Sequence, residues 1–169
     1  MLLLTIWFDL MSFKQRFIGF SSLLLYLIQY ELNWSWEPLE SLQHNDWYKN
    51  STGFLLFGLF LKQWMLPVQR YFFDLKEAEF DKKLKQHNKI GLYSPIIFYF
   101  HAIKPEYGFL FALASLYLFN QLIGLLLEYS YKSKSRVLNL LLSLHIIGVS
   151  LLVVGVGLHI WLVFYYNWG

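Results

Sequence analysis

The feature that most constrains this chain is its C-terminal stretch, because residues 137–169 contain no Asp, Glu, Lys or Arg. An α-helix needs about 20 consecutive apolar residues to cross the hydrocarbon core of a bilayer. A second uncharged stretch runs from Tyr107 to Leu127, and the short connection at 131–136 carries three basic side chains. So short a polar connection between two apolar stretches predicts an antiparallel transmembrane hairpin.

The composition agrees with a membrane location. Hydrophobic residues make up 57% of the chain and charged residues only 15%, whereas a soluble domain carries about 25% charged residues. The absence of cysteine excludes disulfides and thiolate-held metal or iron–sulfur sites. The net charge of +3 is spread without a basic block, which argues against nucleic-acid binding. We therefore predict an all-α integral membrane protein that binds lipids and no nucleic acid.

The first half of the chain holds two weaker apolar stretches, 17–30 and 53–68, the second interrupted by Lys62. A lysine near a helix end can extend its ammonium group to the interface, so each stretch is either a span or a surface-lying helix. The chain then has two to four spans. The predicted regions are a membrane-associated region at 1–68, a polar surface helix and interfacial segment at 69–106, and the hairpin at 107–169.

The distribution of charge predicts the orientation, because basic residues favour the cytoplasmic or matrix side. This rule places Lys14, Arg16 and an amphipathic surface helix at 72–89 inside, and the acidic, tryptophan-rich loop at 34–50 outside. The basic connection at 131–136 then falls outside, against the rule.

Two histidines mark the last apolar stretch. His145, Gly148, Leu152, Gly155 and His159 follow helical spacing and form one stripe, with the imidazoles about 21 Å apart along the axis. Imidazoles buried in helical bundles are typical axial ligands of haem b, and glycines admit a macrocycle or a neighbouring helix. Two interpretations stay open: haem-iron ligation by His145 or His159, or a helix-packing face with interfacial histidines.

The stretch 107–127 contains no histidine. A second haem ligand would therefore come from His101, from the first half of the chain or from another subunit. His44 and His87 are predicted to lie in polar loops and to be solvated. The sequence contains no glycine-rich phosphate loop, zinc-protease motif or nucleophile elbow, so we predict that the chain alone is not an enzyme.

Residues 91–124 resemble the start of the cytochrome b membrane anchor of succinate dehydrogenase, respiratory complex II. The resemblance rests on Ser94-Pro95, Tyr99, Lys104-Pro105 and the following span from Ser115 to Gly124, and then on His145-Ile146-Ile147-Gly148, which is similar to the family's haem histidine and glycine. Where the family has His-Arg, this chain has Asn120-Gln121, so the arginine associated with quinone binding is missing.

The resemblance implies a non-catalytic, multi-pass subunit of succinate:quinone oxidoreductase in the mitochondrial or bacterial inner membrane. It implies that Ser115, Tyr117, Asn120 or Gln121 bonds a ubiquinone, and that His145 or His159 ligates haem b with a histidine of a partner. The implied partners are a second anchor subunit and peripheral redox subunits. The alternative function is a cofactor-free accessory subunit of another respiratory complex or of the ATP synthase.

Overall fold

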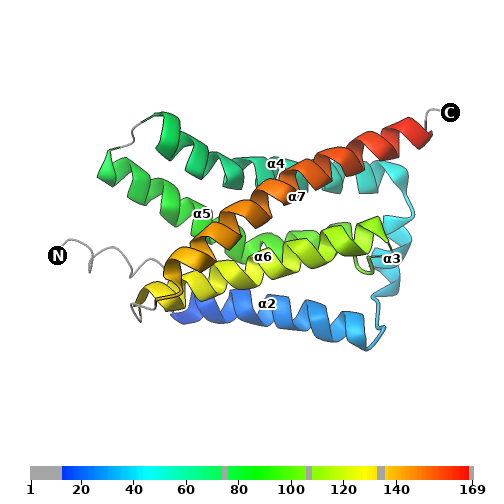
Figure 1. The fold of residues 1–169 in the computed structure, drawn as a ribbon. Helices are drawn as coiled ribbons and strands as arrows, with labels where there is room; N and C mark the ends of the chain where they lie inside the picture. Colours follow the sequence, from blue (N-terminus) through cyan, green and yellow to red (C-terminus); the bar gives the residue numbers. More distant parts are fainter. Residues whose placement is uncertain (1–12, 74–75, 106–107, 133–135, 168–169) are drawn as a thin grey trace.

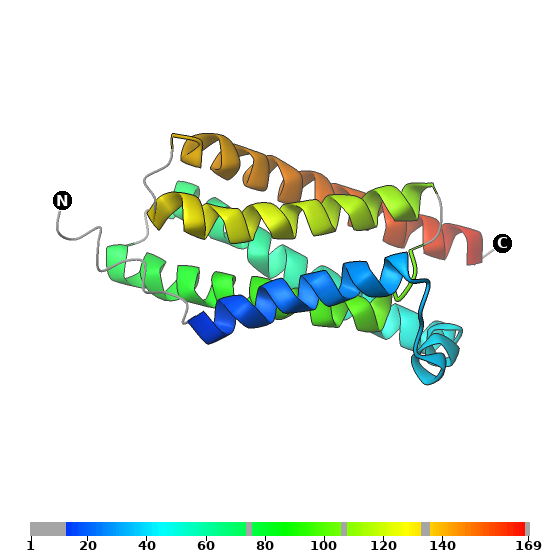
Figure 2. The ribbon, with the colours of Figure 1, turned by 90° about the horizontal axis from the view of Figure 1, so that it is seen from below.

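The computed structural model describes the chain except for residues 1–12, 74–75, 106–107, 133–135 and 168–169. Within the described residues there are six helices and no strand, which confirms the all-α prediction. Five long helices lie side by side, and one short helix lies across one end of the bundle (Figures 1 and 2). The bounds are α2 Phe13–Glu31, α3 Glu37–Gln43, α4 Asp46–Phe72, α5 Glu77–His101, α6 Phe109–Lys132 and α7 Leu138–Asn167.

The predicted hairpin is present as α6 and α7. Two segments of these helices, Phe109–Leu127 and Leu138–Tyr166, are long and apolar enough to cross a membrane. In the first half of the chain, Phe17–Glu31 is apolar but shorter.

Helices α4, α5, α6 and α7 form a ring in which each packs against the next, and α7 closes the ring on α4. Helices α5 and α7 are therefore diagonal to each other, and α2 packs on the outside against α5 and α6. The centre of the ring is filled by large side chains, and Tyr117 of α6 is only 1% exposed there. The core consists of Tyr26, Leu56, Phe60, Phe98, Ala114, Tyr117, Leu152 and Val156.

Helix α5 corrects the prediction of a separate surface helix at 72–89. Residue Phe72 ends α4, and α5 begins only at Glu77 and continues to His101. Proline usually interrupts a helix because it lacks the N–H that would bond the carbonyl four residues earlier. Here the Ser94 hydroxyl donates to the Gly91 carbonyl at 2.9 Å, which is the acceptor that Pro95 leaves without a bond. The helix therefore continues, and its second half packs into the bundle.

The full length of α5 also corrects the predicted sidedness of the 131–136 connection. With α5 running the length of the bundle, the α6–α7 junction lies at the same end as the start of α2 and the α4–α5 connection (Figure 1). Lys132 and Arg136 therefore share this end with Arg70 and the lysines at the start of α5, and Lys134 lies outside the described residues. The opposite end holds the acidic residues Glu31, Glu37, Glu40 and Asp46.

Candidate functional site

Two histidines from the diagonal helices meet inside the bundle. The ring centres of His87 on α5 and His145 on α7 are 6.1 Å apart, and the ring planes are inclined by 83°. A metal bonds an imidazole nitrogen at about 2 Å, and the nitrogen lies about 1.1 Å from the ring centre, so two imidazoles on opposite sides of one ion have centres about 6 Å apart. The 6.1 Å between the two ring centres is close to this value.

Two more histidines, His101 and His159, lie toward the other end of the bundle, and no ring contact joins them in the described part of the chain. His101 follows His87 on α5 by the same interval that separates His159 from His145 on α7. Because α5 and α7 run in the same direction, the equal intervals place His159 toward the same end of the bundle as His101. The two pairs lie about 21 Å apart along the helix axes.

Helix α4 orients the ring of His101. The Thr52 hydroxyl lies 3.1 Å from His101 Nδ1, and a Cβ at Gly53 would stand 3.0 Å from His101 Cε1. The glycine therefore leaves room for the imidazole, and the threonine engages one ring nitrogen. A hydrogen bond at Nδ1 is the usual way in which proteins leave Nε2 available to a metal.

The His87–His145 pair lies among buried polar atoms that lack partners. These atoms are Nδ1 of both histidines, Oε1 of Gln63 and Oδ1 of Asn120. The Gln63 amide donates to the His87 carbonyl at 2.9 Å, and the His145 ring rests against Gly124, where a Cβ would stand 3.4 Å from Cε1. Because buried polar groups are nearly always satisfied, their concentration at one place indicates a site for a bound group.

The histidine pairs suit a macrocyclic metal complex better than a bare ion. Among the described residues, no three His, Cys, Asp or Glu side chains come together to hold a metal. Structural zinc needs four ligands, whereas a porphyrin supplies four equatorial nitrogens and leaves two axial positions for the protein. Each histidine pair contains two imidazoles, one for each axial position.

The glycines of the predicted stripe lie against α6. A Cβ on Gly148 would stand 2.7 Å from Asn120 Oδ1, and one on Gly155 would stand 2.9 Å from Leu113 Cδ1. Both glycines therefore allow α6 and α7 to approach closely. The stripe therefore packs against α6 through its glycines, and His145 at one of its ends has His87 of α5 as a neighbour.

Two of the four residues implied for quinone binding, Tyr117 and Gln121, come together. Ser94, for which the sequence predicts no role in binding, joins them. The hydroxyls of Tyr117 and Ser94 are 2.9 Å apart, and the Gln121 amide donates to Ser94 Oγ at 2.6 Å. Ser94 lies midway between the two α5 histidines, so this polar cluster lies between the two pairs. Ser115 is exposed on another face of α6, and Asn120 is buried against α7.

The prediction that His87 is solvated is wrong, because the residue lies within α5 and faces His145. His44, in contrast, is exposed at the end of α3 as predicted. The sequence did contain a signal for His87 and His101, namely the interval that they share with His145 and His159. The charged residues that flank His87 predict a solvated segment, and they therefore argue against a buried histidine at this position.

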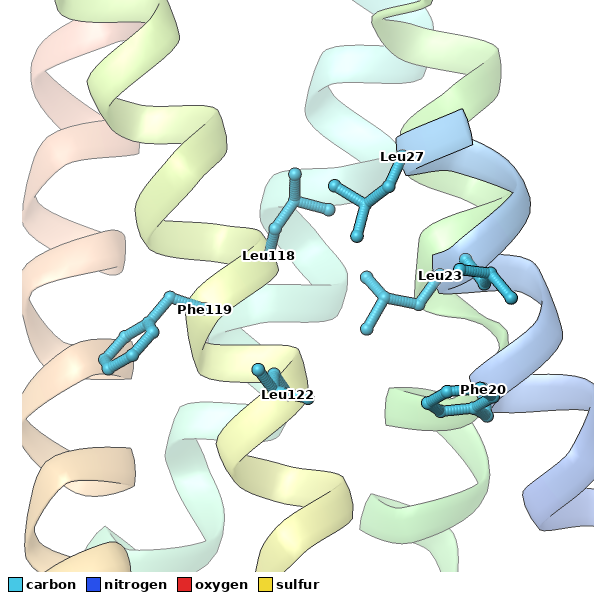
Figure 3. A pocket seen from close by; sticks show the side chains of 7 residues that line it. Phe20, Leu23, Leu27, Leu118, Phe119 and Leu122 are labelled. Carbon is cyan, nitrogen blue, oxygen red and sulfur yellow. The ribbon is translucent and has the colours of Figure 1, made fainter. Parts of the chain in front are cut away.

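An apolar cavity lies away from both pairs, between α2 and α6. It measures about 260 Å³, and its lining is entirely apolar. Figure 3 shows Leu23 and Leu27 of α2 facing Leu118 and Leu122 of α6 across this space. Such a groove can hold a hydrocarbon chain, but it offers no group for catalysis.

Comparison with known proteins identifies no relative: no family model matches the chain, and no curated protein or solved structure is significantly similar to it.

Proposed function

We propose that this chain is a membrane-embedded b-type cytochrome that holds two haems, one on His87 and His145 and one on His101 and His159, and carries electrons across the bilayer. The observation that supports this proposal is the close approach of the His87 and His145 rings on two diagonal helices, with a second histidine on each helix at the same interval. When bound, haem supplies reversible one-electron chemistry at its iron. The role of this chain is to ligate and orient the two groups.

The exposure of α7 supports a membrane location. It is the most apolar part of the chain, yet most of it lies on the outside of the bundle, with Val154 71% and Leu151 56% exposed. The core helix of a soluble protein buries such residues. A lipid-facing helix leaves them outside, and large apolar side chains cover the outer faces of α2 and α6 as well.

The depth of the two pairs supports transmembrane electron transfer. Their separation of about 21 Å is roughly two-thirds of the ~30 Å hydrocarbon core, so each pair would lie near one surface of the membrane. Between them, Tyr117 packs against Phe98 and Phe60 with ring centres 4.5 Å and 5.5 Å away. This aromatic layer is closely packed and carries no charge, so it favours passage of electrons over passage of ions.

The proposal keeps the predicted role as a non-catalytic electron-transfer subunit, in which partner subunits donate or consume the electrons. Membership of complex II and a ubiquinone near Gln121 stay predictions. The haem ligands, however, are proposed to come from this one chain. A partner's histidine is not required for either haem.

The test is a count of haems in the purified chain. Wild-type protein in detergent should show two b-type haems per chain in the dithionite-reduced minus oxidised spectrum. His87→Ala and His145→Ala should each remove one haem, and the double variant should remove no more. The pair His101→Ala and His159→Ala should behave in the same way, because each pair shares one iron.

A double variant that removes one histidine from each pair tests the assignment of the haem ligands further. The variant with His87→Ala and His101→Ala should lose both haems, whereas His44→Ala, at the exposed fifth histidine, should keep both. A wild-type chain without haem in the native membrane would overturn the proposal and favour the cofactor-free accessory subunit. Haem that survives all four single substitutions would overturn the ligand assignment.

A further inference from the structure

A second cavity adjoins the His87–His145 pair, in the groove between α4 and α5. It measures about 160 Å³, and His87 forms part of its wall. Unlike the groove between α2 and α6, it is lined by polar as well as apolar side chains, the apolar ones being Met65, Leu66 and Ile90. The polar lining consists of Lys62, Gln63, Gln69, Lys83, Gln86 and His87.

The charge of this lining suits an anion. Two lysines and three amides line the cavity, and no carboxylate does. The Lys83 ammonium donates to Gln69 Oε1 at 2.9 Å and reaches Glu79 Oε1 at 3.2 Å. Within the described part of the chain, Lys62 forms no ion pair. A group with negative charge and several acceptor oxygens would satisfy these donors, because charge-assisted hydrogen bonds are the strong ones.

We propose that this cavity binds the carboxylates of the haem held by His87 and His145, with Lys62 and Lys83 as the cations. The inference rests on the proposed function. Haem b carries two propionate groups at one edge of the macrocycle, and burying a carboxylate needs a cation and hydrogen-bond donors. Because His87 belongs both to the pair and to the wall of the cavity, Lys62 and Lys83 would be the residues that hold the carboxylates of a group bound at its ring.

A free small carboxylate has the same chemistry, but two features favour the haem. The cavity is too small for a large second ligand, and it lies at the basic end of the bundle, next to one pair only. Two of the lining residues, Gln63 and His87, also carry a buried side-chain atom without a partner. The wall of the cavity and the histidine pair are therefore parts of one continuous site.

The experiment compares Lys62→Met and Lys83→Met with Lys82→Met, an exposed neighbour that does not line the cavity. All three should keep two haems. A cation beside the propionates favours the reduced haem, which carries one more negative charge. In Lys62→Met and Lys83→Met, the midpoint potential of the haem lost in His87→Ala should therefore fall, and haem should transfer faster to apomyoglobin. The haem lost in His101→Ala should not change.

Haem dimethyl ester, whose carboxylates are blocked, separates a direct contact from a general effect of charge. In chain refilled with the ester, the lysine substitutions should no longer change the rate of haem transfer. In haem-loaded protein, transfer rates of Lys62→Met and Lys83→Met that equal the rate of Lys82→Met would overturn the inference. A change in transfer rate on lysine substitution that persists with the ester would also overturn it. Either result would leave the two-haem proposal intact. A shift in potential on adding sodium acetate to wild type would overturn it in favour of a free carboxylate. Absence of haem overturns both.

Discussion

The close approach of α6 and α7 can be tested by adding a single methyl group to Gly148. A Cβ there would stand 2.7 Å from Oδ1 and 3.4 Å from Cγ of Asn120, so the side chain would have to move. Asn120 is only 6% exposed, and its Oδ1 has no partner, so there is little room for it to rotate. Overpacking of this kind costs about 1–3 kcal/mol.

Gly157 on the same helix is the matched control, because a Cβ there would meet nothing within 4 Å. Alanine is favoured over glycine in a helix by about 1 kcal/mol, and both substitutions gain this amount. Gly157→Ala should therefore stabilise the protein by about 1 kcal/mol. Gly148→Ala should be less stable than Gly157→Ala by about 1–3 kcal/mol, a difference of about 2–12 °C in Tm.

The assay is thermal unfolding in detergent, followed by the loss of helical circular dichroism. Gly148→Ala should also weaken the haem assigned to His145, because the displaced Asn120 lies beside that ring. Equal melting temperatures for the two variants would refute the reasoning. They would mean that α6 and α7 do not meet at Gly148.

Four further predictions concern the hydrogen bonds of Thr52 and Tyr117, the charge at the two ends of the bundle, and the topology of the helices. Thr52→Val should weaken haem binding at His101 by about 10–100-fold while Thr52→Ser retains it, because the bond to Nδ1 is lost only in the first; haem transfer to apomyoglobin measures this. Tyr117→Phe should lower stability by about 1–2 kcal/mol, against less than about 0.5 kcal/mol for the exposed Tyr165→Phe, measured by unfolding in detergent. In a redox titration, the haem at the basic end should have the higher midpoint potential, and the difference should narrow with added salt; the opposite order would contradict the proposed charge effect. Because the chain has no cysteine, single cysteines can be introduced and labelled with an impermeant maleimide. Cysteines at 76 and 136 should react from one side of the membrane, and a cysteine at 37 should react from the other. Labelling of 76 and 136 from opposite sides would contradict the five-helix arrangement.

The hairpin and the all-α fold were predictable because they depend on local composition. Long uncharged stretches bounded by polar residues can satisfy their backbone in a bilayer only as helices. The continuation of α5 was harder to predict, since Pro95 and the charged residues before it both suggest an interruption. The compensating bond from Ser94 to the Gly91 carbonyl depends on a side-chain rotamer, which no composition or periodicity reveals.

The candidate site was predicted in part, for a related reason. The stripe from His145 to His159 lies within one helix, so its spacing could be worked out from the sequence alone. The partners of these histidines depend on which helices are diagonal neighbours, and that arrangement follows from α5 running parallel to α7. A surface helix at 72–89 places His87 outside the bundle, whereas His101, beyond that helix, is among the predicted sources of a second ligand.

The two ends of the bundle, each with one histidine pair, differ in charge. Arg70, Lys132 and Arg136 gather at the end that holds the His87–His145 pair, whereas Glu37 and Asp46 lie at the end that holds His101 and His159. A positive potential favours a reduced haem, so the field along the bundle favours an electron at the basic end. By the positive-inside rule, we expect the same basic residues to orient that end toward the cytoplasm or matrix. We therefore expect electrons to move inward across the membrane, from the His101–His159 pair to the His87–His145 pair.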